Sequence, residues 1–134
     1  MNRFHHIGIF VKNLDFGKKE ISKFIKVASS SDEIIDEGMG VKIIFLKDKE
    51  GIRYELVAPY GDKSPVTGVL KRKKDFLNHI AHETDNFEME INRLRDEGLV
   101  PLGTPKKAKA FHGSRVIFFL SQLGFIIELI EVKK

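Results

Sequence analysis

The sequence predicts an α+β fold built from two similar modules, each with the element order β-α-β-β-β. The first observation behind this prediction is an internal repeat, because a shift of 73 residues superposes the two halves without a gap. Identical residues brought together by the shift include His6 and His79, Gly40 and Gly113, and Glu55 and Glu128. The second observation is a shared pattern: an extended stretch, an amphipathic stretch, and apolar segments broken by glycine.

Each half opens with a short segment rich in β-forming residues, at 6–11 and at 79–84. A helix is predicted after each segment, capped by Asn13 in the first half and by Asp85 in the second. Apolar residues at or near helical spacing mark the buried faces of these helices: Leu14, Ile21, Ile25, Phe87, Ile91 and Leu94. Gly98 is predicted to end the second helix.

Three further strands are predicted in each half, at 27–30, 41–46 and 52–58, and at 100–102, 116–120 and 125–132. The polar loop 47–51 contains a glycine and joins two of these strands as a hairpin. We therefore expect module one at 1–60, a linker at 61–74 and module two at 75–134. Because neither module buries both faces of its sheet alone, the two are expected to pack into a single domain, 1–134.

Composition and charge exclude several classes of function. With 42% hydrophobic and 31% charged residues, the chain has the balance of a folded globular protein. No apolar run approaches the roughly 20 residues of a membrane span, and no signal peptide is apparent, so we expect a cytoplasmic protein without a membrane partner. The basic run Lys71–Lys74 is short and lacks interleaved aromatics, so we expect no nucleic-acid binding. Since cysteine is absent, any metal must be held by His, Asp or Glu.

Four polar residues stand where the strand pattern favours apolar ones. Glu128 interrupts an apolar strand, and Glu55 occupies the matching place in the first half. His6 and His79 open the first strand of each half, 49 residues before the matching glutamate. A single such His or Glu is more often structural, but the same pair at the same spacing twice favours ligands. Two imidazoles and two carboxylates make a mixed site for a divalent first-row metal.

Several motifs carry a family resemblance over nearly the whole chain. They lie at 6–14 (HIGIFVKNL), 54–66 (YELVAPYGDKSPV), 78–86 (NHIAHETDN), 111–120 (FHGSRVIFFL) and 127–131 (IELIE). These motifs resemble the vicinal-oxygen-chelate superfamily, which includes glyoxalase I, methylmalonyl-CoA epimerase, extradiol dioxygenases and bleomycin-resistance proteins. The chain is most similar to the epimerases and their glyoxalase-like relatives. The resemblance implies the glyoxalase/bleomycin resistance/dioxygenase fold.

The resemblance also implies a function and a set of site residues. His6, Glu55, His79 and Glu128 would bind one divalent ion of nickel, cobalt, zinc, manganese or iron, with no further cofactor. Glu128 would act as the catalytic base, with Glu55 as the other candidate. The implied enzyme is a metal-dependent isomerase or lyase that removes a proton next to a metal-bound carbonyl, most like methylmalonyl-CoA epimerase. Its substrate would be an acyl-CoA or another small carbonyl compound, and the protein would be a homodimer.

Some departures from the family pattern keep alternatives open. The strand after Gly40 has no carboxylate, although some epimerases have a second acid/base glutamate there, and Phe10 replaces an arginine of bacterial glyoxalase I. The alternatives are lactoylglutathione lyase (glyoxalase I), an extradiol dioxygenase, and a metal-free protein that sequesters a ligand. The presence of four ligands disfavours the last two. His82 is expected to face away from the site. His5 is the alternative to His6 as a metal ligand, and His112 is interpreted as part of a turn.

Overall fold

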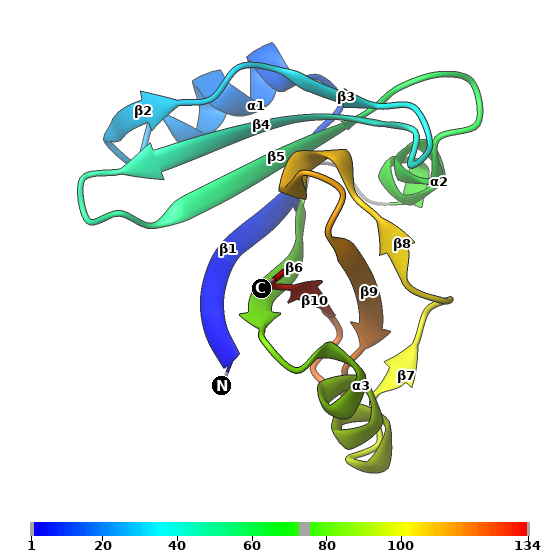
Figure 1. Ribbon diagram of the computed structural model, residues 1–134. Helices are drawn as coiled ribbons and strands as arrows, with labels where there is room; N and C mark the ends of the chain where they lie inside the picture. Colours follow the sequence, from blue (N-terminus) through cyan, green and yellow to red (C-terminus); the bar gives the residue numbers. More distant parts are fainter. Residues whose placement is uncertain (1, 73–75, 134) are drawn as a thin grey trace. The chain divides into compact units, whose positions relative to one another are not determined.

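The computed structural model describes residues 2–72 and 76–133, which contain ten strands and three α-helices (Figure 1). Among these residues, one compact unit spans 6–78, and a second combines the residues up to His5 with those from His79 onward. None of the described helices has the length and apolar character that crossing a membrane requires. Two lysines of the basic run Lys71–Lys74 lie outside the described residues.

The unit that begins at His6 is a mixed sheet in contact with two helices. Its elements are β1 (Asn2–Phe10) from His6 onward, α1 (Leu14–Ile21), β2 (Val27–Ser30), β3 (Ile34–Asp36), β4 (Val41–Asp48), β5 (Arg53–Pro59) and α2 (Pro65–Arg72). The strand order is β2-β4-β5-β1, and β3 also pairs with β4. β1 runs parallel to β5, whereas the other pairs are antiparallel. α1 packs on β4 and β5 (Figure 1) over a core of Val11, Ile21, Leu46, Leu56 and Ala58.

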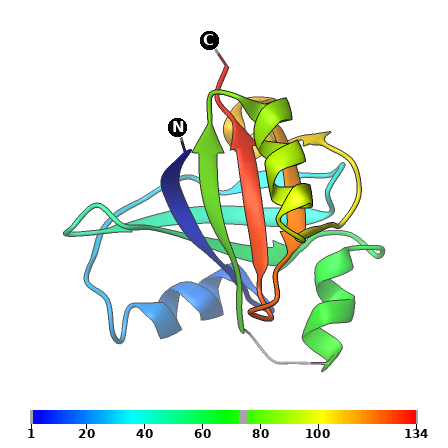
Figure 2. The ribbon, with the colours of Figure 1, turned by 90° about the horizontal axis from the view of Figure 1, so that it is seen from below.

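The other unit repeats this arrangement. Its elements are β6 (Phe76–Thr84), α3 (Phe87–Asp96), β7 (Val100–Pro101), β8 (Lys106–Lys107), the 3-10 helix η1 (Lys109–Phe111), β9 (Arg115–Leu120) and β10 (Ile126–Glu131). The strand order is β6-β10-β9-β7, and β8 also pairs with β9. β6 runs parallel to β10. Figure 2 shows α3 lying against β10, where it covers a core of Phe87, Ile91, Ile117, Phe119 and Leu129.

The strand pairings confirm the internal repeat. The pairs that the shift of 73 residues relates are Gly8–Glu55 with Ala81–Glu128, and Phe45–Glu55 with Phe118–Glu128. Each glutamate therefore has the same neighbours on both sides in its own sheet. Each half also contains a short strand that the sequence did not predict, β3 in one and β8 in the other.

The two helix starts differ in how well the sequence predicted them. Asn13 is the N-cap of α1, as predicted, and its Oδ1 accepts a hydrogen bond of 2.7 Å from the backbone N–H of Phe16. The prediction of Asp85 as the second cap was wrong, because α3 begins after Asn86. The backbone N–H of Asn86 donates to the Thr84 hydroxyl at 3.2 Å, which holds the turn that precedes the helix. Asn86 is also the residue that the repeat superposes on Asn13.

Gly17 allows α1 to approach the segment that follows β1. A Cβ atom at position 17 would lie 2.8 Å from Cγ1 of Val11, whose side chain is buried. We expect Gly17→Ala to destabilise the protein by about 1–3 kcal/mol through overpacking, although Ala is normally favoured over Gly inside a helix. Urea unfolding measures the change.

Gly68 provides the matched control in α2, because a Cβ atom there would meet nothing within 4 Å. Gly68→Ala should therefore stabilise the protein, by up to about 1 kcal/mol. If Gly17→Ala were equally stabilising, the close packing of α1 on Val11 would be incorrect.

Candidate metal centre

One buried histidine–glutamate pair lies on β1 and β5. Gly8 pairs with Glu55 in the parallel register, so His6, two residues earlier on β1, projects from the same face as Glu55. Nε2 of His6 lies 3.3 Å from Oε1 of Glu55. Both residues are buried, with 0% and 4% of their surface exposed. The ring of Phe45 meets the His6 ring edge-on, with the centroids 5.5 Å apart.

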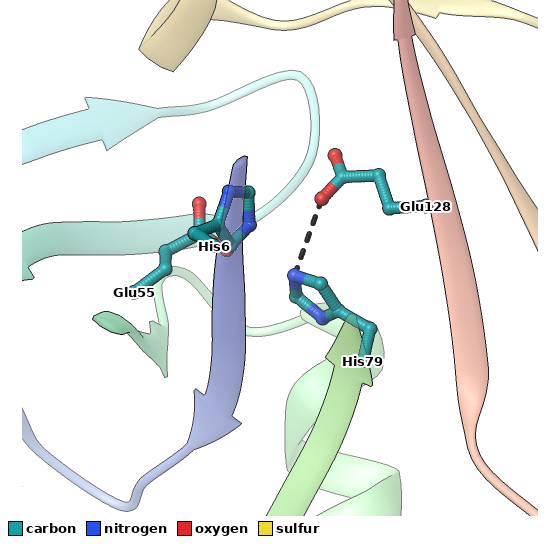
Figure 3. A group of neighbouring side chains, drawn as sticks. All are labelled: His6, Glu55, His79 and Glu128. Atoms are coloured by element: carbon teal, nitrogen blue, oxygen red, sulfur yellow. Dashed lines mark ion pairs between the residues drawn. The ribbon is translucent and has the colours of Figure 1, made fainter. Parts of the chain in front are cut away.

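An equivalent pair lies on β6 and β10. His79 is paired with Ile126, two residues before Glu128, so the imidazole and the carboxylate again share a face. Nε2 of His79 lies 3.2 Å from Oε1 of Glu128 (Figure 3). Each residue is 3% exposed. The Phe118 ring meets the His79 ring edge-on at 6.0 Å between centroids.

A buried carboxylate beside an imidazole needs compensation for its negative charge. Removal of an ionised carboxylate from water costs several kcal/mol unless a positive charge lies next to it. A proton on the imidazole or a metal cation can supply that charge. Imidazole nitrogen and carboxylate oxygen are both good ligands for divalent first-row metals, so the donor atoms of these buried pairs fit a metal ion.

Comparison with known proteins places the chain in a family. The model of the glyoxalase/bleomycin resistance protein/dioxygenase superfamily matches residues 5–118, which is most of the chain. The chain belongs to this superfamily. The family resemblance predicted from the sequence is therefore confirmed.

Several relatives within the superfamily are epimerases. The mitochondrial methylmalonyl-CoA epimerase of Dictyostelium discoideum is 28% identical over 134 residues, which cover 98% of this chain and 79% of the relative. The ethylmalonyl-CoA/methylmalonyl-CoA epimerase of Cereibacter sphaeroides is 27% identical, and the match covers 98% of this chain and 99% of the relative. The crystal structure of methylmalonyl-CoA epimerase from Mycobacterium tuberculosis shares the fold, with a TM-score of 0.80 and 22% identity. The match covers 98% of this chain and 88% of that chain.

Arg115 holds β9, β10 and α3 together on the sheet face opposite Glu128. Its guanidinium donates to both carboxylate oxygens of Glu131, at 3.0 and 2.8 Å. It also lies 3.0 Å from a carboxylate oxygen of Glu88 and stacks over the ring of Phe87 at 4.8 Å. The hydrogen bonds from Arg115 hold the pKa of the Glu131 carboxyl below its ordinary value of 4.5. This network supports the strand that carries Glu128 in the superfamily fold.

The lowered pKa of Glu131 predicts how the contribution of Arg115 depends on pH. A carboxyl with a depressed folded-state pKa contributes stability above its unfolded pKa, and that contribution is lost as the pH falls through the folded value. We expect Arg115→Gln to lower the thermal midpoint by a few degrees at pH 7, and this difference should narrow as the pH falls below about 4.5. Calorimetry at pH 7 and pH 3.5 measures both differences. If Arg115→Gln lowered the thermal midpoint equally at both pH values, the Arg115–Glu131 ion pair would contribute nothing to stability.

None of the remaining histidines, His5, His82 and His112, is a member of either pair. His82 pairs with Leu129, so it projects from the α3 face, as the sequence predicted, and burial lowers its pKa. The His5 ring meets the Phe111 ring at 5.4 Å. His112 adopts a left-handed conformation with φ of 55°, in the turn that precedes β9.

Two site residues were missed by the sequence analysis, Phe45 and Phe118. Each lies edge-on to a histidine of a buried pair. The signal that would have found them is the repeat, which superposes Phe45 on Phe118 as it superposes the glutamates. Both phenylalanines pair directly with those glutamates across the sheet.

Proposed function

We propose that this chain is a divalent-metal-dependent epimerase that removes a proton next to the carbonyl of an acyl-CoA thioester and returns it. The observation that carries the proposal is a buried group of four side chains that offers one ligand atom from each residue, all within 4.8 Å of one another: His6, Glu55, His79 and Glu128 (Figure 3). The epimerases among the relatives support the reaction class and the substrate class.

The four side chains would together hold one divalent ion. Two neutral imidazoles and two carboxylates carry two negative charges, which a divalent cation balances. When bound, the ion supplies a Lewis acid that stabilises negative charge developing on a carbonyl oxygen, so that the neighbouring proton becomes removable near neutral pH. Nickel, cobalt, zinc, manganese and iron all accept these donor atoms.

Glu128 is the proposed base, and Glu55 is its proposed partner in returning the proton. Epimerisation requires that the proton return to the opposite side of the carbon, which one fixed carboxylate does not readily achieve. On β4, the residues that share a face with Phe45 are Val41, Ile43 and Lys47, of which the first two are apolar and 6% exposed. Because β4 supplies no second carboxylate on this face, the strand pattern favours Glu55 for the second role. The apolar walls also keep water away from the exchanging proton.

The test is proton exchange on one epimer of methylmalonyl-CoA in deuterated water. The metal-loaded protein should incorporate deuterium at the α-carbon and convert the substrate to a mixture of epimers. Absence of incorporation with each of the five metals would contradict the proposal. A parallel reaction with the hemithioacetal of glutathione separates the classes, because turnover of that substrate alone would assign a lyase instead. The homodimer remains a prediction, which sedimentation velocity tests.

A further inference from the structure

Each histidine of the two buried pairs lies against a phenylalanine ring. The rings of His6 and Phe45 have centroids 5.5 Å apart, and their planes meet at 80°. The rings of His79 and Phe118 have centroids 6.0 Å apart, and their planes meet at 75°. Aromatic rings prefer this edge-to-face arrangement, because the positive edge of one ring meets the negative face of the other. The same contact is therefore made once in each compact unit.

Strand register places each phenylalanine beside the glutamate of its own pair. Phe45 stands opposite Glu55 in the pairing of β4 with β5, and Phe118 stands opposite Glu128 in the pairing of β9 with β10. Residues directly opposite on one face of an antiparallel pair have Cβ atoms about 5 Å apart. In each unit, three neighbouring strands thus bring a phenyl ring, an imidazole and a carboxylate together.

The plane of an imidazole decides where its nitrogen binds. The nitrogen lone pair lies in the plane of the ring, so a tilt of the ring moves the lone pair away from a ligand position. The terminal torsion of a histidine side chain is broad and does not fix the plane by itself. Contact with a neighbouring ring has to select one plane, with Nε2 of His6 3.3 Å from a Glu55 oxygen and Nε2 of His79 3.2 Å from a Glu128 oxygen.

We propose that Phe45 and Phe118 are positioning residues that fix the planes of the two buried imidazoles and so the direction in which each Nε2 binds. The inference rests on the proposed function for the metal, whereas the orientation of each ring is a property of the protein alone. Loss of a phenyl ring would leave the histidine in place but let its plane tilt. Metal binding would then weaken although every ligand is still present.

The strand β9 supplies a matched control for this role. Phe119 follows Phe118 but projects from the opposite face, where it is 0% exposed in the core under α3. Cobalt(II) is titrated into metal-free wild type, Phe118→Leu and Phe119→Leu. Phe118→Leu should weaken cobalt binding about fivefold, which is the size of an aromatic pair contact, and change the visible absorption of the bound ion. Phe119→Leu should lower the urea midpoint but leave the affinity and the spectrum unchanged.

The internal repeat supplies a second control, which needs no metal. NMR relaxation of the metal-free protein gives the order parameter of the Cε1–H bond in each imidazole. Phe118→Leu should lower this order parameter for His79 and leave that of His6 unchanged. Phe45→Leu should do the reverse, because each contact lies within one unit.

Three results decide the inference. Equal weakening of cobalt binding by Phe118→Leu and Phe119→Leu would overturn it, because the effect would then come from general loss of packing. Imidazole order that is unchanged in both Phe45→Leu and Phe118→Leu would also overturn it. If the variants loosened their own imidazoles but even wild type bound no cobalt, the positioning role would be supported and the proposed function contradicted.

Discussion

Glu128→Gln should lower the rate of α-proton exchange by about a thousandfold while the protein remains folded. Glutamine has nearly the same shape, so its side chain fits the position of the native carboxylate, whose Oε1 lies 3.2 Å from Nε2 of His79. An amide does not accept a proton near neutral pH, so the proposed base is lost. The measurement is kcat for deuterium incorporation, made on samples whose metal content is also determined.

A control on the same strand separates the loss of the base from the loss of a negative charge. Glu131 projects from the opposite face, where it binds Arg115, so Glu131→Gln should leave kcat within about twofold of wild type. If the Glu128→Gln protein retains its metal but loses α-proton exchange, Glu128 is a base and not only a metal ligand. An unchanged rate in a metal-loaded Glu128→Gln protein would refute the assignment.

Removal of the metal should lower the thermal midpoint of unfolding by about 10 °C or more. A ligand that binds only the folded protein stabilises it by about 4 kcal/mol at a thousand times its dissociation constant. At this chain length each kcal/mol corresponds to several degrees. The four buried side chains also carry charge that the ion would balance. Thermal scans with and without a chelator measure the shift, and added divalent metal should reverse it.

His79→Ala supplies the control for this shift. Because the variant lacks one of the four proposed ligands, its midpoint should respond little to the chelator. If the wild-type midpoint were the same with and without chelator, the four side chains would serve a structural role without a metal.

The internal repeat explains how much of the fold the sequence predicts. A shift of 73 residues superposes Glu55 on Glu128, and the strand pairs around the two glutamates follow the same shift. A parallel pairing found in one half therefore predicts the pairing in the other. The short strands β3 and β8 escaped prediction because they contain three and two residues, too few for an alternating pattern.

Local pattern was less reliable where packing decides the outcome. Asp85 and Glu88, three residues later, have the spacing of a capping box, yet α3 begins after Asn86. Helix starts are set by the turn that leads into them, and here that turn is held by Thr84. The repeat, which relates Asn86 to Asn13, was the better guide than the local motif.

The candidate site also combines a feature that the sequence pattern predicts with a feature that it does not predict. Alternation along each strand predicts that a glutamate faces inward, but the 3.3 Å contact of His6 with Glu55 depends on β1 lying parallel to β5. These strands are separated along the chain by a helix and three strands, so no local pattern specifies their contact.

Metal content is the measurement to make first. The protein is purified without chelator or a metal-affinity tag, and wild type, His79→Ala and His82→Ala are compared by elemental analysis. His82 is the control because it shares β6 with His79 and faces the other side. About one divalent ion per chain in wild type and in His82→Ala, and none in His79→Ala, is the expected result. Wild-type protein that contains no metal and takes up none on titration would contradict the four-ligand centre and the reaction proposed for it.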